Sequence, residues 1–399
     1  MARTVEDPEI RGAFNAAFTR AGYDAFLRDL DTRLRFPTDF RVAETPLFLS
    51  EAFARELVAA ATDILGLLQS PGFSRHAAGA LPPGISFPDP DAHPSMIQID
   101  FGIAQDEAGE FVPQLIELQG FPSLYCFQAY FESVLRDHFA VPDGMTAYFN
   151  GCSPETYMQE LRDVIVADAD PAETILLEIE PERQKTRIDF AATEKALGIR
   201  AVCVTRVRKR GRGLFYDRDG RETRIRRIYN RVVFDELERK NPAMEFSFHD
   251  ALDVTWVPHP SWYYRISKHS LPFLDSRHVP HCMLVSRMPR VPGDLSHYVL
   301  KPLYSFAGGG VIVDVTEQDM RKITDPDAWI LQKKVRYAPF VPTEDEPSKA
   351  EIRMMVLWTD RPRLVTNLVR MSKGKMMGVD FNKNRTWVGS SIAFVPPSL

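Results

Sequence analysis

The chain has 399 residues, of which 44% are hydrophobic and 26% charged, a composition typical of folded proteins rather than disordered or collagen-like chains. One hydrophobic core rarely serves more than about 250–300 residues, so this length predicts more than one domain. The 49 basic and 54 acidic residues give a formal charge of −5 with both signs mixed along the chain. This balance favours neither a nucleic acid nor a membrane as partner.

Targeting signals and cysteines point to the cytoplasm. Residues 1–11 are polar and acidic, unlike a secretory signal, and no run of about 18 apolar residues occurs that could span a bilayer. The cysteines are too widely spaced for a zinc motif or a dense disulfide framework. We therefore expect reduced thiols in a cytoplasmic protein; the four are Cys126, Cys152, Cys203 and Cys282.

Residues 1–94 are predicted to form a helical N-terminal region. Between Asp7 and about Ser70, apolar residues recur mostly at steps of three and four, which is the helical period. Proline and glycine then mark a boundary at 81–84 and 88–90.

A hairpin is predicted next, from strand-like stretches at 97–101 and 114–119 joined by a turn at 106–109. Glu117 and Gln119 would point to one face, with Asp100 nearly opposite residues 115–117. Carboxylates crowded on a half-buried surface repel one another, and a hard cation such as Mg²⁺ would relieve that repulsion. The alternative is a solvated polar face.

Helical segments are expected at 127–139 and 154–166, ahead of a third region. Residues 174–233 are predicted to form a strand, a helix, a strand, a hairpin and a strand, a pattern that favours α/β structure with parallel strands. No G-x-G-x-x-G follows the first strand, which disfavours an ordinary dinucleotide site.

Lys301 precedes three consecutive glycines, Gly308, Gly309 and Gly310, between predicted strands at 298–302 and 311–315. Backbone N–H groups of such a loop can approach an anion, and the lysine adds a positive charge. The segment lacks the P-loop pattern, and a simple hairpin turn would use the same glycines.

Arg353 and Arg370 lie on two further predicted strands, at 351–356 and 364–370, with the turn near residue 361. That register brings Arg353 close to residues 369 and 370. Neighbouring guanidinium groups are destabilising unless an anion lies between them, which favours a bound phosphate or carboxylate. A surface pair partnered by Glu351 is the alternative.

Other catalytic classes lack their signatures. No H-x-x-x-H or H-E-x-x-H pair supports a zinc hydrolase, and no G-x-S-x-G supports a serine hydrolase.

Taken together, these segments resemble the ATP-grasp superfamily. Lys268 in Ser267–Leu274 resembles the first nucleotide lysine, and Lys301 with its glycines resembles the second lysine and the phosphate loop. Gln332 and Lys333 stand where the family has its adenine-binding hinge strand. Glu351-Ile352-Arg353 and Arg370 resemble its phosphate-facing arginine strands.

The metal segment of that family is E-x-N-x-x-P, and Glu117-Leu118-Gln119-Gly120-Phe121-Pro122 resembles it with glutamine in place of asparagine. Asp100 resembles the metal aspartate, and Asn382 could substitute for Gln119. Here this segment precedes both lysines, whereas ordinary members place it after the arginines. That order resembles circularly permuted ATP-grasp proteins of the glutathionylspermidine synthase type.

The resemblance implies an α/β (α+β) chain with a circularly permuted ATP-grasp fold. Its parts would be the helical region 1–94, a permuted metal-binding part at 95–170, an α/β pre-ATP-grasp substrate domain at 171–250 and nucleotide-binding subdomains at 251–399. Arg231, Glu180 and Gln184 in the substrate domain are candidates for substrate contact, or an ordinary surface cluster.

The implied activity is ATP-dependent and Mg²⁺-dependent ligation of a small-molecule carboxylate, activated as an acyl-phosphate, to an amine. Arg353 and Arg370 would then be catalytic. An ATP-grasp small-molecule kinase and a catalytically inactive nucleotide-binding protein are alternatives. The sequence leaves the substrates and the oligomeric state open.

Overall fold

The computed structural model describes residues 4–305, 309–378 and 382–397. Its α-helices are α1 Pro8–Ala17, α2 Arg20–Leu34, α3 Glu51–Leu68, α4 Pro71–Ala78, α5 Tyr125–His138, α6 Pro154–Ile165, α7 Arg187–Leu197, α8 Phe234–Lys240, α9 Trp262–Arg265 and α10 Glu317–Arg321. None of these helices combines the length and apolarity that crossing a membrane requires.

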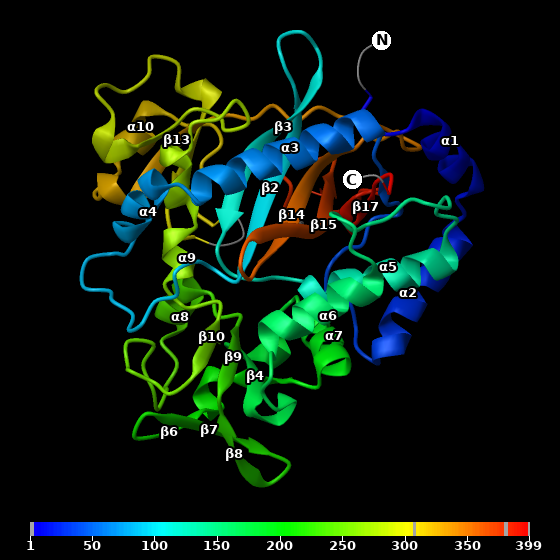
Figure 1. The fold of residues 1–399 in the computed structure, drawn as a ribbon. Helices are drawn as coiled ribbons and strands as arrows, with labels where there is room; N and C mark the ends of the chain where they lie inside the picture. The colour runs from blue at the N-terminus through cyan, green and yellow to red at the C-terminus, as the bar shows by residue number, and fades with distance from the viewer. Residues whose placement is uncertain (1–3, 306–308, 379–381, 398–399) are drawn as a thin grey trace.

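The central element is an antiparallel sheet of order β16-β15-β14-β2-β3, built from opposite ends of the chain. Hairpin β2–β3 comes from the first third and hairpin β14–β15 from the last, and β14 pairs antiparallel with β2. Figure 1 shows these cyan and orange strands side by side. The strands are β2 Met96–Gln105, β3 Phe111–Gln119, β14 Lys349–Trp358, β15 Pro362–Ser372 and β16 Gly389–Ser391.

Helix α3 covers one face of this sheet (Figure 1). Its Phe53, Leu57 and Ile64 are fully buried against Ile97 and Ile99, which alternate on β2 with polar residues of the other face. This alternation is the two-residue period of a strand. Burial of this apolar face therefore fixes Gln98 and Asp100 on the opposite face.

The N-terminal region is not packed as a separate body. Strand β1 Leu47–Phe48 pairs in parallel with β17 Ala393–Phe394 at the far end of the chain. A second apolar cluster joins Phe26 of α2 to Phe127 and Phe131 of α5. Residues 4–94 thus share their cores with the rest of the molecule.

The mid-chain α/β region is confirmed as predicted. Its parallel sheet has the order β10-β9-β4-β5, and a three-stranded antiparallel sheet, β6-β7-β8, extends from it. The strands are β4 Thr174–Glu178, β5 Arg200–Cys203, β6 Arg208–Arg210, β7 Gly213–Arg218, β8 Arg221–Ile225, β9 Arg227–Asn230 and β10 Thr255–Val257.

A smaller sheet of order β11-β13-β12 carries Lys301. Its strands are β11 Cys282–Leu284, β12 Tyr298–Pro302 and β13 Trp329–Lys333. The predicted strand 311–315 is wrong in the described part: only Ile312 forms a bridge, to Leu300. The segment that begins with Lys268 forms a 3₁₀ helix, Lys268–Phe273.

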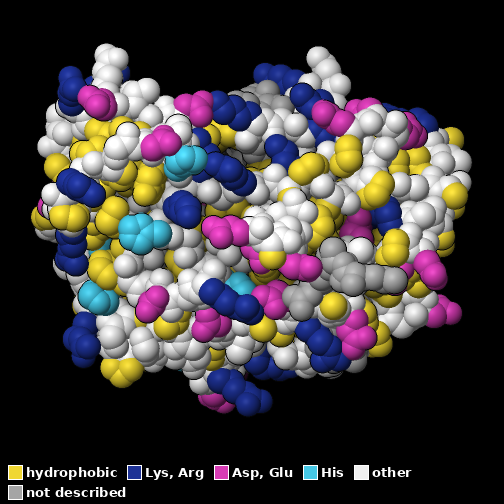
Figure 2. All heavy atoms as spheres, turned by 90° about the horizontal axis from the view of Figure 1, so that it is seen from above, with side chains coloured by type: hydrophobic (Ala, Val, Ile, Leu, Met, Phe, Trp, Pro, Cys, Tyr) yellow, Lys and Arg dark blue, Asp and Glu magenta, His cyan; other side chains and the backbone are white. Residues whose placement is uncertain are grey.

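The four cysteines are free and buried, which confirms the prediction of unpaired thiols. On the face seen in Figure 2, acidic and basic side chains are interspersed rather than gathered into one patch of either sign. This distribution agrees with the mixed charge pattern of the sequence.

Candidate functional site

The candidate site lies on the polar face of the central sheet. Asp100 on β2 is paired with Glu117 on β3, which confirms the predicted hairpin and its register. Arg353 on β14 is paired with Asp100 from the other side. Arg370 on β15 is paired with Glu351 of β14. Residues from both ends of the chain therefore meet on one surface.

Asp100 occupies the space between the two arginines. Its Oδ1 accepts a hydrogen bond from Arg353 Nε at 2.6 Å, and its Oδ2 accepts from Arg353 Nη2 at 2.7 Å and Arg370 Nη2 at 2.6 Å. Burial alone would raise the pKa of Asp100, but the charges and hydrogen bonds of Arg353 and Arg370 hold it below its ordinary value. Asp100 is therefore a buried carboxylate with charged partners on both oxygens.

This arrangement corrects the interpretation of the arginine pair. The anion between Arg353 and Arg370 is a carboxylate of the protein itself, and Arg353 lies opposite Leu368 rather than residues 369 and 370. Glu351 adds an ion pair to Arg370 at 2.8 Å. Arg370 nevertheless keeps one donor, Nε, which is buried and has no hydrogen-bond partner.

Two buried lysines approach from outside the central sheet. Lys268, at the start of the 3₁₀ helix, places Nζ 3.3 Å from Glu117 Oε1 and donates to the carbonyl of Ser305. Lys301 on β12 donates from Nζ to the carbonyl of Ile116 at 3.0 Å. Both side chains thus lie against β3.

Burial lowers the pKa of Lys301 below that of an ordinary lysine. The charge of Lys268 lowers it further, while Glu117 opposes the shift. A buried ammonium with a neutral carbonyl as its hydrogen-bond acceptor is poorly compensated. A bound anion would supply the missing negative charge.

Glu117 and Gln119 line one small cavity, together with Lys268 and Tyr304. Gln119 Oε1 is buried and has no hydrogen-bond partner. A carboxylate and an amide oxygen are suitable ligands for Mg²⁺, which usually takes one or two carboxylates and completes its shell with water and phosphate. No cluster of three His, Cys, Asp or Glu residues able to hold a metal occurs within the described ranges. Glu117 and Gln119 fit such a partial site, whereas the oxygens of Asp100 are already engaged.

The side-chain oxygen of Asn382, which a metal ion would need as its ligand, is already engaged by groups of the protein. Its Oδ1 accepts hydrogen bonds from Ser372 Oγ and from the backbone N–H groups of Lys373 and Gly374, at 3.0–3.1 Å. These contacts hold the loop that follows β15. Asn382 also lines a separate cavity, away from Glu117.

The predicted hinge and loop residues are divided between the interior and the surface. Gln332 on β13 is buried and donates to the carbonyl of Leu115 at 3.3 Å, while Lys333 at the end of that strand is exposed. Gly309 and Gly310 form a turn in which Gly310 has φ +71°. Gly308 lies outside the described residues.

The three candidate substrate residues do not form one cluster. Arg231 is buried and donates to the carbonyl of Pro122, just beyond β3. Glu180 is partly exposed and pairs with Lys240 at 2.7 Å, and Gln184 donates to the carbonyl of Ile179. In the described structure no hydrogen bond or ion pair joins Arg231 to the other two.

Sequence reasoning missed two buried acids near Arg231. Asp189 accepts hydrogen bonds from the N–H groups of Leu124 and Phe127 and so caps the start of α5. Glu178 accepts one from Ile179 N–H. Both carboxylates interact electrostatically with Arg231. No local pattern signals this, because Asp189 is separated from the helix it caps by more than sixty residues.

Glu178 gives the protein a predicted pH dependence. Burial raises its pKa to about 8, although the charge of Arg231 opposes the shift. Between the ordinary carboxyl pKa and about 8 the folded state binds the proton more tightly than the unfolded state, so stability falls as the pH rises through this window. We expect Glu178→Gln to raise the free energy of unfolding at pH 9 by roughly 2–4 kcal/mol, with little effect at pH 4.

Urea unfolding at both pH values measures this difference. The matched control is Glu180→Gln, which removes an exposed carboxylate two residues away and should show no such gain at high pH. Parallel pH profiles for the wild type and Glu178→Gln would contradict the prediction.

Comparison with known proteins gives structural neighbours but no sequence match. No protein-family model matches the chain, and neither does any curated protein. Among solved structures, the apo form of a glutathione synthetase-like effector from Globodera pallida matches with a TM-score of 0.55 and 12% identity, covering 98% of each chain. The class defined in this way is a mixed α/β fold similar to that of glutathione synthetase-like proteins. At this identity the likeness shows the fold alone.

Proposed function

We propose that the protein is an ATP-dependent carboxylate–amine ligase with a circularly permuted ATP-grasp fold. It would form an amide or peptide-like bond and release ADP and phosphate. One observation carries the proposal: Lys268 and Lys301 converge with Glu117 on β3, beside Arg370 and Asp100. The glutathione synthetase-like fold of the chain supports it.

The two lysines are suited to hold the phosphates of ATP. Their ammonium groups contact the neighbouring residues Ile116 and Glu117 of β3, and both lysines are buried, so an anion there would be attracted with little screening by water. Gly309 and Gly310, beyond Lys301 in the chain, would add backbone N–H donors. Gln332 and Lys333 remain the proposed adenine-side residues.

Glu117 and Gln119 would hold Mg²⁺ next to these phosphates. When bound, the ion would neutralise phosphate charge and orient the nucleotide, as it does in phosphoryl transfer generally. The orphaned Oε1 of Gln119 is the feature that favours this role. Asp100 would act indirectly, by fixing the two arginines.

Arg370 is the better placed of the two arginines to contact substrate. Arg353 is held by both oxygens of Asp100 and by Gln98 Oε1 at 3.0 Å, so it acts as a positioning residue for Asp100. Arg370 is 37% exposed and keeps its free Nε. It would stabilise negative charge that develops on the transferring phosphoryl group.

The engagement of Asp100 favours a second candidate function. Because both its oxygens are taken up by arginines, the site offers a metal fewer carboxylate ligands than the sequence predicts. A nucleotide-binding protein without turnover would need the lysines but not a complete metal site.

A product assay separates these candidates. The protein is incubated with ATP, Mg²⁺ and pools of amino acids, short peptides and polyamines, and ADP and new amides are detected by mass spectrometry. A ligase gives ADP and an amide in equal amounts, whereas a kinase gives a stable phosphorylated product. A protein without turnover gives only a rise in melting temperature with ATP.

Lys301→Met is expected to weaken ATP binding by about tenfold or more, because it removes a buried cation facing the phosphates. Stability should be kept or raised, since methionine fills similar space and leaves no charge to bury. Isothermal titration with ATP measures the first effect and urea unfolding the second. Lys322→Met, at an exposed position directly after α10, is the control. Unchanged ATP affinity in Lys301→Met would contradict the proposed phosphate site.

A further inference from the structure

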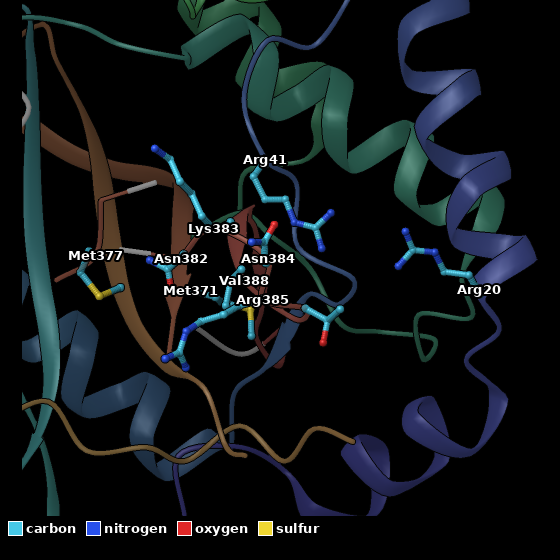
Figure 3. Close-up of a pocket in the computed structure, with 11 residues that line it drawn as sticks. Arg20, Arg41, Met371, Met377, Asn382, Lys383, Asn384, Arg385 and Val388 are labelled. Atoms are coloured by element: carbon cyan, nitrogen blue, oxygen red, sulfur yellow. The ribbon is translucent and has the colours of Figure 1, made fainter. Parts of the chain in front are cut away.

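Arg370 keeps an unpaired donor in the interior, unlike the arginines around the larger cavity of the molecule. Figure 3 shows Arg41 and Arg385 at that cavity, where they extend away from each other. The first is paired with Glu44 and the second with Glu346. In Arg370 the Nε atom is buried and has no hydrogen-bond partner among the described residues. Such a donor is costly to bury, so the contacts that leave it free need a reason.

The carboxylate beside Arg370 engages only one of its two parallel donors. Arg353 shows the full arrangement, in which Nε and Nη2 donate together to the two oxygens of Asp100, at 2.6 and 2.7 Å. Arg370 has the same pair of donors, but only Nη2 is engaged, by Asp100 at 2.6 Å and by Glu351 Oε2 at 2.8 Å. If Oε1 of Glu351 joined Nε, it would complete a second bidentate ion pair, the arrangement that guanidinium and carboxylate groups favour.

The hydroxyl of Tyr337 prevents this, because it donates its hydrogen bond to Oε1 of Glu351. Within the part of the chain that the structure describes, no other donor bonds this oxygen. Burial and the charge of Glu351 raise the pKa of Tyr337 well above its ordinary value, so the hydroxyl keeps its proton and stays a donor. Glu351 is therefore shared between Tyr337 on one oxygen and Arg370 on the other.

The ring of Tyr337 is held in place where the pairing between β14 and β2 ends. That pairing stops at Gly102, which lies opposite Glu351, and the backbone of Tyr337 continues it by forming a bridge with Ala104. The ring packs against Gly102, where a Cβ atom would lie 2.7 Å from Tyr337 Cε1. Glycine at this position therefore makes room for the ring beside Glu351.

We propose that Tyr337 is a positioning residue for Arg370: by occupying Oε1 of Glu351, it keeps Nε of Arg370 free for an anionic ligand. The identity of that ligand rests on the proposed function, under which it is the terminal phosphate of ATP. Asp100 holds Nη2 of Arg370 whichever way Glu351 lies. ADP lacks the terminal phosphate, so Tyr337 should matter for binding ATP and not for binding ADP.

Tyr337→Phe removes only the hydroxyl, and a crystal structure of this variant tests the ion-pair geometry without any nucleotide. We expect Oε1 of Glu351 at hydrogen-bond distance from Nε of Arg370. If Glu351 kept its place and Nε stayed unpaired, or if the carboxylate turned towards Lys301 instead, the proposal would be wrong. Because no ligand is needed, this result is independent of whether the protein binds ATP.

Isothermal titration of the full chain with Mg²⁺ and either a non-hydrolysable ATP analogue or ADP tests the role in binding. Tyr337→Phe should weaken binding of the analogue about tenfold and leave that of ADP within about twofold. Tyr337→Phe/Glu351→Gln should regain most of the lost affinity, because glutamine cannot form the second ion pair with Arg370. The matched control is Tyr216→Phe, which removes a buried hydroxyl bonded to the carbonyl of Ala172 at 2.7 Å and should leave both affinities unchanged.

These measurements separate the two claims. Equal losses for the analogue and ADP in Tyr337→Phe, or no recovery in the double variant, would mean that the hydroxyl only supports packing, and would overturn the proposal. A wild-type protein that binds neither nucleotide would contradict the nucleotide site. The positioning of Arg370 by Tyr337 would still hold in that case if Glu351 moved onto Arg370 in the crystal structure of Tyr337→Phe.

Discussion

Glu117→Gln is expected to reduce turnover by about a thousandfold or more while ATP still binds within a few-fold of the wild-type affinity. Glu117 is the carboxylate that faces both the orphaned amide of Gln119 and the ammonium of Lys268. The substitution keeps the shape of the side chain and removes the charge that would hold Mg²⁺. The lysines remain, so the nucleotide keeps its phosphate contacts.

The fold should survive this change, because the side chain of Glu117 is 22% exposed and its ion pair with Lys268 is long, at 3.3 Å. Steady-state ADP release, ATP titration and thermal unfolding would be measured together. Glu107→Gln, in the exposed turn of the same hairpin, is the matched control. If Glu117→Gln kept full turnover, β3 would not carry the metal segment.

Asp100→Asn is expected to have the largest effect on stability, a loss of about 3–5 kcal/mol in the free energy of unfolding. The substitution leaves Arg353 buried without its bidentate partner and removes the second ion pair of Arg370. Breaking one side of a buried ion pair is costly because the remaining charge stays desolvated.

A double-mutant cycle distinguishes this cause from a general packing defect. Asp100→Asn/Arg353→Met removes the stranded charge as well, so it should recover part of the lost stability. Urea unfolding of the two single variants and the double variant gives the coupling energy. If the double variant lost as much free energy of unfolding as the two single variants together, the buried ion-pair network would not be coupled in this way. Wild-type stability of Asp100→Asn alone would also contradict the prediction.

The sequence predicts the hairpins of the central sheet well, because alternating polar and apolar residues define both their strands and their faces. It predicts the details of register less well. Bulges interrupt the pairing between Asp100 and Phe101 and between Met355 and Val356. A bulge shifts every residue beyond it by one position and leaves no clear trace in the residue pattern. In β14–β15 the bulge moves the partner of Arg353 from Asn367 to Leu368. The predicted partner was Val369, because the prediction centred the turn on residue 361, whereas the turn is centred on Asp360.

Long-range contacts were the harder part of the site to predict. The sequence groups Arg353 with Arg370, and Asp100 with Glu117. Asp100 lies between the two arginines only because β2 pairs with β14, some 250 residues away in the chain. The strand predicted at 311–315 fails for a related reason. Its apolar residues favour a strand, but Gly310, with φ +71°, turns the chain just before them. Asp314 forms ion pairs with Lys334 and Lys375 at the surface.

A crystal structure of the full chain with Mg²⁺ and a non-hydrolysable ATP analogue tests the central claim most directly. The account predicts the triphosphate between Lys268 and Lys301, with the metal ion on Glu117 and Gln119 and Arg370 close to the terminal phosphate. A nucleotide bound elsewhere in the molecule, or no nucleotide at a saturating concentration, would contradict it.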